Sequence, residues 1–346
     1  MMTSPLNTYA PWCKSRRPDV YERLVEREKA AGPIPAEVHM NAWAVERATA
    51  FLDDRPQDRP FFLMVSLFDP HNPYDDHPPA WEERVDADAL PPLIPPTRDA
   101  WPTGVAAHAD HNYFARFDDL DAATLRRMRV GYHAEVAYAD AAFGQVLDLI
   151  ESRGLAGDTL VVFVSDHGDL LGDHGLMVKG PVGYDANIRV PAIVRWPGEI
   201  DRATRHSGPT QLNDLTALML GAAGIDADLP DAVDPLPSLR GEGGGRRFAI
   251  NAYRNSGLAS GHVPHDPPIH LTVATDGRWK LCHYHAGPGD ATPRGGQLFD
   301  LQRDPLELRD LHEDPHAADE RARLMEAIVD FIAEEHRLDA ASARPS

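Results

Sequence analysis

Three short apolar runs constrain the fold of this 346-residue chain more than any other feature. They are Phe61 to Phe68 (FFLMVSLF), Thr159 to Asp166 (TLVVFVSD) and Val190 to Trp196 (VPAIVRW). Apolar runs of this length are typical of strands that are buried on both faces of a sheet. A helical pattern from Asp121 to Arg153, ended by Gly154, lies between the first run and the second. Because strand and helix alternate, we expect an α/β fold with a mostly parallel sheet flanked by helices.

The two ends of the chain differ from this centre. Residues 1–36 are polar and rich in proline, with one predicted helix from Asp19 to Ala31, and a helical pattern follows over residues 37–54. The proline- and glycine-rich stretch 224–247 indicates a linker. Beyond it, four short strand patterns and a final helix over residues 317–336 predict a small antiparallel sheet. We therefore expect two domains, residues 1–223 and 224–346.

The composition excludes several classes of protein. The net charge of −20 argues against a nucleic-acid partner, since such proteins carry a basic face. Cys13 and Cys282 are the only cysteines, too few for a disulfide framework or a cysteine-rich zinc site. No stretch approaches the roughly 18 apolar residues of a membrane span, so no membrane partner is expected. The first residues lack the apolar core of a signal peptide, which predicts a cytoplasmic protein as the sequence is given.

Chemically useful side chains follow two of the predicted strands. His71 comes just after the first apolar run, and Asp166 and His167 end the second. Because ligands bind beyond the carboxyl ends of parallel strands, we expect these residues to converge. A carboxylate and an imidazole together can bind a divalent ion, and Lys179 can supply a positive charge for a tetrahedral oxyanion.

Simpler interpretations exist for several of these residues. An isolated Asp-His-Gly at a strand end is also common as a turn. His174 is expected to be structural rather than a ligand. Residues 75–118 are rich in proline, aspartate and histidine and are predicted to cross the surface, so His77, His108 and His111 are interpreted as exposed.

Five segments resemble the sulfatase family of the alkaline phosphatase superfamily, and they follow the family's order. They are PFFLMVSLFDPHNPY (60–74), SDHGDLLGDHGLMVKG (165–180), YDANIRVPAIVRWPG (184–198), TDGRWKLCHYHAG (275–287) and QLFDLQRDPLELRDLHEDP (297–315). The resemblance extends from about residue 37 to the C-terminus. It implies a metal-dependent hydrolase of sulfate monoesters with a small anionic ester as substrate.

The resemblance also implies a role for each residue of the predicted site. Asp166 and His167 would be metal ligands, His71 would contact the sulfate or the leaving-group oxygen, and Lys179 would bind a sulfate oxygen. The ion is usually Ca²⁺ in this family. Other members have asparagine at the position of His167, and because imidazole nitrogen also suits Mn²⁺ or Zn²⁺, the ion stays open among Ca²⁺, Mn²⁺, Mg²⁺ and Zn²⁺.

The nucleophile that the resemblance implies is not found. In the family it is a cysteine of a Cys-x-Pro/Ala-x-Arg motif, converted to formylglycine, on a segment before these motifs. Cys13 has an arginine at the matching spacing, but Ser15 replaces the expected proline or alanine. The nucleophile therefore stays unknown, and we expect it on about 100–150 further residues upstream. Without them the sheet would have an unpaired edge, which predicts homo-oligomers or aggregation.

Three functions remain open on this evidence. The first is a sulfatase whose given sequence lacks its N-terminal segment. The second is a phosphonate monoester or phosphodiester hydrolase of the same superfamily, which acts on similar anions. The third is a non-catalytic remnant, against which stands the presence of all four predicted site residues.

Overall fold

The computed structural model describes residues 7–25, 32–111, 120–200, 203–254, 268–286 and 295–342, with only the backbone at 100, 110, 111 and 336–342. Contacts divide the chain into two compact units. Unit 1 comprises Met1–Pro92 with Leu120–Gly157, and unit 2 comprises Leu93–Asp119 with Asp158–Ser346. Each unit is described separately below. No helix among the described residues has the length and apolar character needed to cross a membrane.

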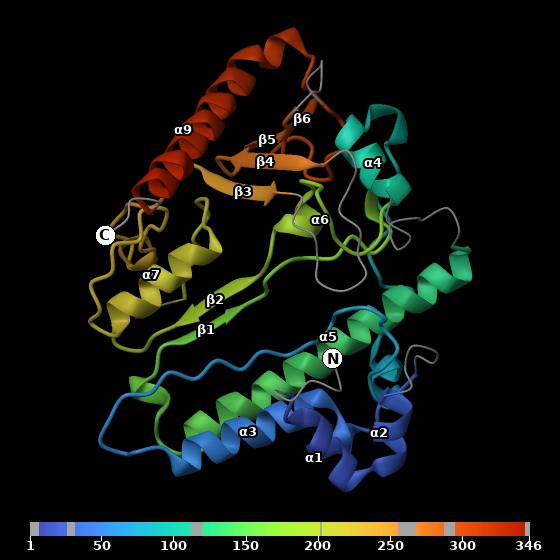
Figure 1. The fold of residues 1–346 in the computed structure, drawn as a ribbon, viewed down its shortest axis with the longest axis vertical. Helices are drawn as coiled ribbons and strands as arrows, with labels where there is room; N and C mark the ends of the chain where they lie inside the picture. The colour runs from blue at the N-terminus through green and yellow to red at the C-terminus, as the bar shows by residue number, and fades with distance from the viewer. Residues whose placement is uncertain are drawn as a thin grey trace. The chain divides into compact units, whose positions relative to one another are not determined.

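Unit 1 is helical, and two of its helices, α3 and α5, pack side by side (Figure 1). The long predicted helix is confirmed as α5, whose first turn is capped by the Asp121 carboxylate accepting from Thr124 N–H at 2.7 Å. The loop after residue 68 lies against α5, where a Cβ on Gly131 would stand 1.9 Å from the Tyr74 carbonyl oxygen. The elements of unit 1 are α1 (Tyr9–Arg16), α2 (Pro18–Val25), η1 (Ala36–Val38), α3 (Met40–Asp54), η2 (Pro79–Arg84) and α5 (Ala122–Ser152).

Two expectations for unit 1 need correction. The N-terminal region contains two helices rather than one, and residues 26–31 of the predicted helix lie outside the described residues. The run Phe61–Phe68 was expected to be a strand buried on both faces, but it pairs with no strand among the described residues. Phe62 and Met64 are 71% and 76% exposed. Apolar composition favours an extended chain, but burial requires neighbouring strands on the same sheet.

Unit 2 contains both sheets. In the smaller one, β1 and β2 pair antiparallel, from Val161 opposite Arg195 to Val164 opposite Ala192. The α/β class is confirmed, but the parallel pairing expected of these strands is not what the described residues show. The elements are η3 (Arg98–Ala100), α4 (Thr103–His111), η5 (Ala156–Asp158, at the boundary of the units), β1 (Val161–Val164), η6 (Asp173–Gly175), α6 (Asp185–Ile188), β2 (Ala192–Arg195), α7 (Leu212–Ala222), α8 (Leu236–Leu239), β3 (Ala249–Arg254), β4 (His270–Thr275), β5 (Trp279–Tyr284), β6 (Gly296–Asp300), η7 (Pro315–Ala317) and α9 (Ala318–Ser342).

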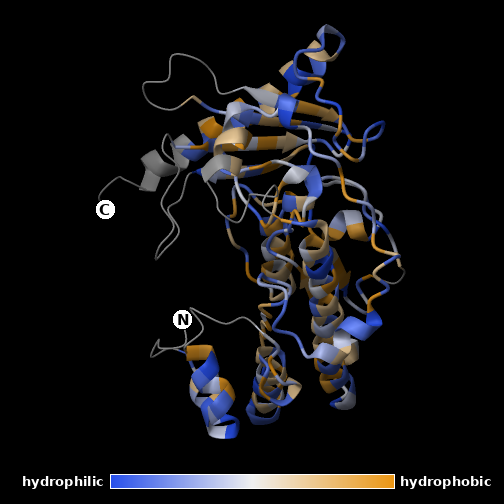
Figure 2. Ribbon diagram, turned by 90° about the vertical axis from the view of Figure 1, so that its right-hand side faces the viewer, coloured by the Kyte–Doolittle hydropathy of each residue, from blue (hydrophilic) through white to orange (hydrophobic). Residues whose placement is uncertain are grey.

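The predicted C-terminal sheet is confirmed as four antiparallel strands in the order β3-β4-β5-β6. Its strands are largely apolar, as Figure 2 shows. One face packs against α9 through Leu281, Leu324 and Ile328 (Figure 1). The other face packs against the loop of residues 170–184 through Val273 and Tyr284. Because strand side chains alternate between faces, this sheet both binds the last helix and supports the loop that contains Lys179.

Candidate functional site

Asp166 and His167 lie just beyond β1, where the sequence places them, and their side chains are 85% and 39% exposed. The Asp166 carboxylate accepts from His167 N–H at 3.0 Å. Ring nitrogen Nδ1 of His167 lies 2.8 Å from the carbonyl oxygen of Gly168. Since a carbonyl can only accept, Nδ1 carries the proton and Nε2 presents its lone pair.

This arrangement fits a divalent cation. Nε2 of His167 stands 3.7 Å from Oδ2 of Asp166, a separation that one ion with ligand bonds of about 2.1–2.4 Å can bridge. A histidine that donates its other ring N–H to a backbone carbonyl is also the usual form of a metal ligand. The donor set combines one carboxylate oxygen and one imidazole nitrogen.

Lys179 lines the same cavity as Asp166 and His167. The carboxylates of Asp169 and Asp166 act on its ammonium group and favour the charged form, while burial lowers its pKa and dominates. The preceding residue, Val178, has φ of 53°, a conformation that is costly for a β-branched residue. Its carbonyl accepts from Leu170 N–H at 2.8 Å, which closes the loop before Lys179. The half-buried ammonium is thereby held beside two carboxylates.

Asn187 connects the two parts of this site, and its role has no signature in the sequence. Its carbonyl accepts from Gly168 N–H at 2.8 Å, next to His167. Its side-chain amide donates to the carbonyls of Gly180 and Val182 at 2.9 and 2.7 Å, just after Lys179. Asn187 is buried in α6, so one residue fixes the segment after His167 relative to the segment after Lys179.

Helix α6 is anchored by a buried ion cluster, which we call the lysine triad: Asp185, Lys280 and Glu307. Lys280 Nζ lies 2.6 Å from Asp185 Oδ1 and also pairs with Glu307. Glu307 accepts from the backbone N–H of Asp185 at 2.7 Å. Burial lowers the pKa of Lys280, but the two carboxylates outweigh it and raise the pKa, so the lysine stays charged. The triad holds the first turn of α6 on strand β5.

The site opens into a cavity of unit 2 with a volume of about 1920 Å³. Asp166, His167 and Lys179 line it together with His108. The prediction that His108 lies on the surface is wrong: it is 2% exposed and packs against Gly180, where a Cβ would stand 2.2 Å from the ring. An isolated histidine in a polar stretch carries no sequence signal for burial.

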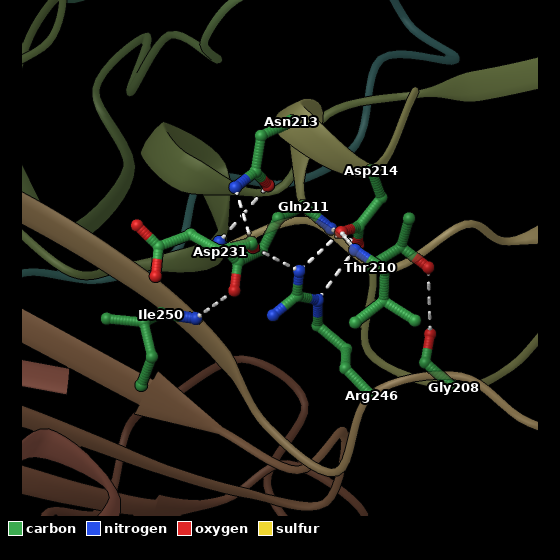
Figure 3. A network of polar contacts seen from close by, with 9 residues as sticks. Gly208, Thr210, Gln211, Asn213, Asp214, Asp231, Arg246 and Ile250 are labelled. Atoms are coloured by element: carbon green, nitrogen blue, oxygen red, sulfur yellow. Dashed lines mark hydrogen bonds and ion pairs between the residues drawn. The ribbon is translucent and has the colours of Figure 1, made fainter. Parts of the chain in front are cut away.

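A buried polar network forms another part of the cavity wall (Figure 3). Gln211 caps α7 and accepts from Ile250 N–H of the large sheet at 3.0 Å. Asp214 accepts from Arg246 Nε at 2.9 Å and from Gln211 N–H at 2.8 Å. Although burial raises the pKa of Asp214, these bonds outweigh it and lower the pKa. The network ties the cavity-lining segment before α7 to the sheet.

Three further histidines were singled out in the sequence, and they belong to both units. His174, expected to be structural or to support a ligand rather than to be one, is fully buried and stacks on Tyr184 with ring centroids 3.7 Å apart. Burial lowers its pKa to about 4. In unit 1, His77 is 1% exposed, so its expected exposure was also wrong. The side chain of His111 lies outside the described residues.

His71 belongs to unit 1, whereas Asp166, His167 and Lys179 belong to unit 2. Its Nδ1 lies 2.9 Å from the Asn72 carbonyl, and its ring packs on Phe68 with centroids 4.5 Å apart. A site that combines His71 with Asp166, His167 and Lys179 would need residues of both units, so the predicted convergence stays a prediction.

The two cysteines do not resemble nucleophiles. Cys13 is fully buried in the core of unit 1, and burial raises the pKa of its thiol. Burial also raises the pKa of Cys282, to about 12. Both thiols are therefore protonated at neutral pH, whereas the nucleophilic form is the thiolate.

Comparison with known proteins agrees with this picture. The chain is 29% identical over 280 residues to a choline-sulfatase of Rhizobium meliloti, covering 79% of this chain and 50% of that protein. It is 29% identical over 315 residues to the multifunctional alkaline phosphatase superfamily protein PehA of Trinickia caryophylli, covering 82% of this chain and 57% of that protein. The chain thus spans about half the length of these relatives.

The fold is shared with solved structures. The phosphonate monoester hydrolase of Agrobacterium radiobacter matches with a TM-score of 0.74 at 22% identity, over 94% of this chain and 69% of that one. At this identity the match shows a shared fold. The chain belongs to the sulfatase family, because the sulfatase model matches residues 8–225. A model of the C-terminal region of N-sulphoglucosamine sulphohydrolase matches residues 172–334.

Proposed function

We propose that this chain forms the metal-binding part of a sulfatase-type hydrolase of sulfate monoesters. The observation that carries the proposal is the orientation of His167, whose Nε2 presents its lone pair next to Asp166 in a cavity that Lys179 also lines. A bound divalent cation would supply positive charge to an ester oxygen. Ca²⁺ is the expected ion, and Mn²⁺ and Mg²⁺ are the alternatives.

The side chains account for binding the anionic ester. Lys179 would bind a sulfate oxygen and stabilise the charge that develops as the bond between sulfur and the bridging oxygen breaks. His71 would contact the sulfate or the leaving-group oxygen. Hydrolysis consumes one water and yields an alcohol and inorganic sulfate. Since neither cysteine suits the role, the nucleophile is not assigned to a residue of the given chain.

The proposal is tested with native protein purified from its source cells. Hydrolysis of 4-nitrophenyl sulfate should stop after EDTA treatment and return with Ca²⁺, Mn²⁺ or Mg²⁺. The double variant Asp166→Asn/His167→Ala should not recover, whereas Asp158→Asn, an exposed acid before β1, should behave as wild type. Full activity of the double variant would refute the metal role. An intact mass above 38.1 kDa would locate the nucleophile on further polypeptide.

A second candidate is hydrolysis of phosphonate monoesters or phosphodiesters. The similarity to PehA, over 82% of this chain, favours it. The two functions are separated by competition: a sulfate monoester and a phosphodiester are offered together at equal concentration. The substrate consumed with the higher kcat/KM identifies the activity.

A further inference from the structure

Unit 1 buries a second group of acidic residues, which lies outside the site described above. We call Asp69, Asp76 and Glu135 the acid cluster; they are 8%, 2% and 0% exposed. Asp69 and Asp76 lie in the loop after the extended segment 61–68, and Glu135 lies in the middle of α5. All three belong to unit 1.

The acidic side chains face one another at short range. Ligand atoms of Asp69, Asp76 and the neighbouring His39 all lie within 4.8 Å of one another. Glu135 lies within hydrogen-bonding reach of Asp76, and its carboxylate is also acted on by Asp69. Neither oxygen of Glu135 receives a hydrogen bond from the described residues, and the nearest ring nitrogen, Nδ1 of His77, is 3.6 Å away. A fully buried carboxylate is therefore directed into the cluster without a donor.

The chain supplies little positive charge to compensate these acids. The charges that act most strongly on Asp69 and Glu135 come from other carboxylates and from His77, and none belongs to a lysine or arginine. Buried charges are normally paired or bound to a metal.

The hydrogen bonds of His39 decide which atoms could bind an ion. Its Nδ1 accepts from the backbone N–H of Asn41 at 3.1 Å, as the N-cap of α3. Since a backbone N–H can only donate, the ring proton is on Nε2, which faces Asp69 Oδ2 at 3.9 Å. His39 therefore presents an N–H to the cluster rather than a lone pair. The side-chain amide of Asn41 donates to Asp69 Oδ2 at 2.8 Å, and the donors available to an ion are carboxylate oxygens.

We propose that Asp69, Asp76 and Glu135 bind one hard divalent cation, which joins the loop after residue 68 to helix α5. Oxygen ligands of this kind suit Mg²⁺, Ca²⁺ and Mn²⁺. Because the site is buried, a substrate would not reach the ion. Its role is therefore structural and independent of the hydrolytic function proposed above. Two ion sites thus exist in the chain, one in each unit.

The test uses the full chain in the background Asp166→Asn/His167→Ala, which removes the site of unit 2. After removal of metals with a chelator, Mn²⁺ binding is measured by electron paramagnetic resonance and equilibrium dialysis. The background variant should bind one Mn²⁺ per chain. Adding Glu135→Gln should weaken Mn²⁺ binding by at least about tenfold. Glu151→Gln, the same change at an exposed position of α5, should leave it unaltered.

Two results would overturn the proposal. One is that the folded background variant binds no Mn²⁺. The other is that both Glu135→Gln and Asp76→Asn bind Mn²⁺ as tightly as the background does. Urea unfolding of each variant shows that it is folded, and Asp76→Asn provides the test if Glu135→Gln is not. Mn²⁺ should also raise the melting temperature of the background variant, by mass action on the folded state.

Discussion

Both units bury a group of carboxylates, but among the described residues only the group in unit 2 encloses a lysine. The lysine triad places the ammonium of Lys280 between Asp185 and Glu307, and it is only 1% exposed. The acid cluster of unit 1 has comparable burial and no lysine or arginine among the charges that act most strongly on it. In unit 2 the chain provides the counter-charge and the group joins two elements; for the acid cluster of unit 1, we propose that a bound cation provides it.

The largest effect is expected when the internal cation is removed. Lys280→Met should lower the free energy of unfolding by about 3–5 kcal/mol, because the buried Glu307 and the partly exposed Asp185 lose their counter-charge. Urea denaturation measures it, with Lys14→Met, an exposed lysine, as the control. A loss below about 1 kcal/mol would mean that the triad does not depend on its lysine, and the comparison of the two units would fail.

Lys179 is another partly buried lysine of unit 2, but its predicted role is chemical. Lys179→Ala should lower kcat for sulfate ester hydrolysis by about 10²–10³-fold, the loss typical of one group that stabilises a developing oxyanion. The free energy of unfolding should hardly change, since Lys179 is only half-buried. Steady-state kinetics and urea denaturation on the same samples test this. A large stability loss with unchanged kcat would make Lys179 a second structural lysine.

Replacing Asn187 is expected to affect both stability and catalysis, each less than replacing Lys280 or Lys179 does. Asn187→Ala should cost about 1–3 kcal/mol of stability, because two buried carbonyls lose their donor. Asn187→Asp should cost more, since it places a carboxylate against those carbonyls. Thermal denaturation compares the two variants. If Asn187→Asp has the higher melting temperature of the two, the side-chain amide does not connect the two segments of the site.

The smallest effect should come from the acid cluster without metal. In the presence of a chelator, Glu135→Gln should stay within about 1 kcal/mol of wild type or be more stable, since the change removes a buried acid and adds a hydrogen-bond donor. Glu151→Gln serves as the control on the same helix. If Glu135→Gln instead lost several kcal/mol under these conditions, Glu135 would already have a compensating partner in the protein.

Local features of the fold were predictable. Helix α5 begins after the capping Asp121 and ends two residues before Gly154, as its sequence pattern indicates. The four C-terminal strands also follow their patterns. Asp166 and His167 are adjacent in the chain, so their proximity needs no tertiary information. The sequence pattern did not predict which ring nitrogen of His167 carries the proton, because that depends on the position of the Gly168 carbonyl.

Pairing and burial were harder to predict. The run Phe61–Phe68 is apolar enough for a buried strand, yet alternate residues are exposed because no described strand lies beside it. His77 and His108 lie in a polar stretch and are nevertheless buried, each by residues distant in the sequence. Composition within a short window cannot report on such distant neighbours.

The sequence by itself determined the family, helix α5, the four C-terminal strands and the four candidate residues His71, Asp166, His167 and Lys179. Only the tertiary structure decided that β1 and β2 run antiparallel, and that Asn187 connects the segments after His167 and Lys179. It also decided that one buried acid group has a lysine and the other has none. The physical reason is the distance along the chain over which each effect acts. Helix caps and strand patterns depend on a few neighbouring residues, whereas burial, charge compensation and strand direction depend on segments that folding brings together.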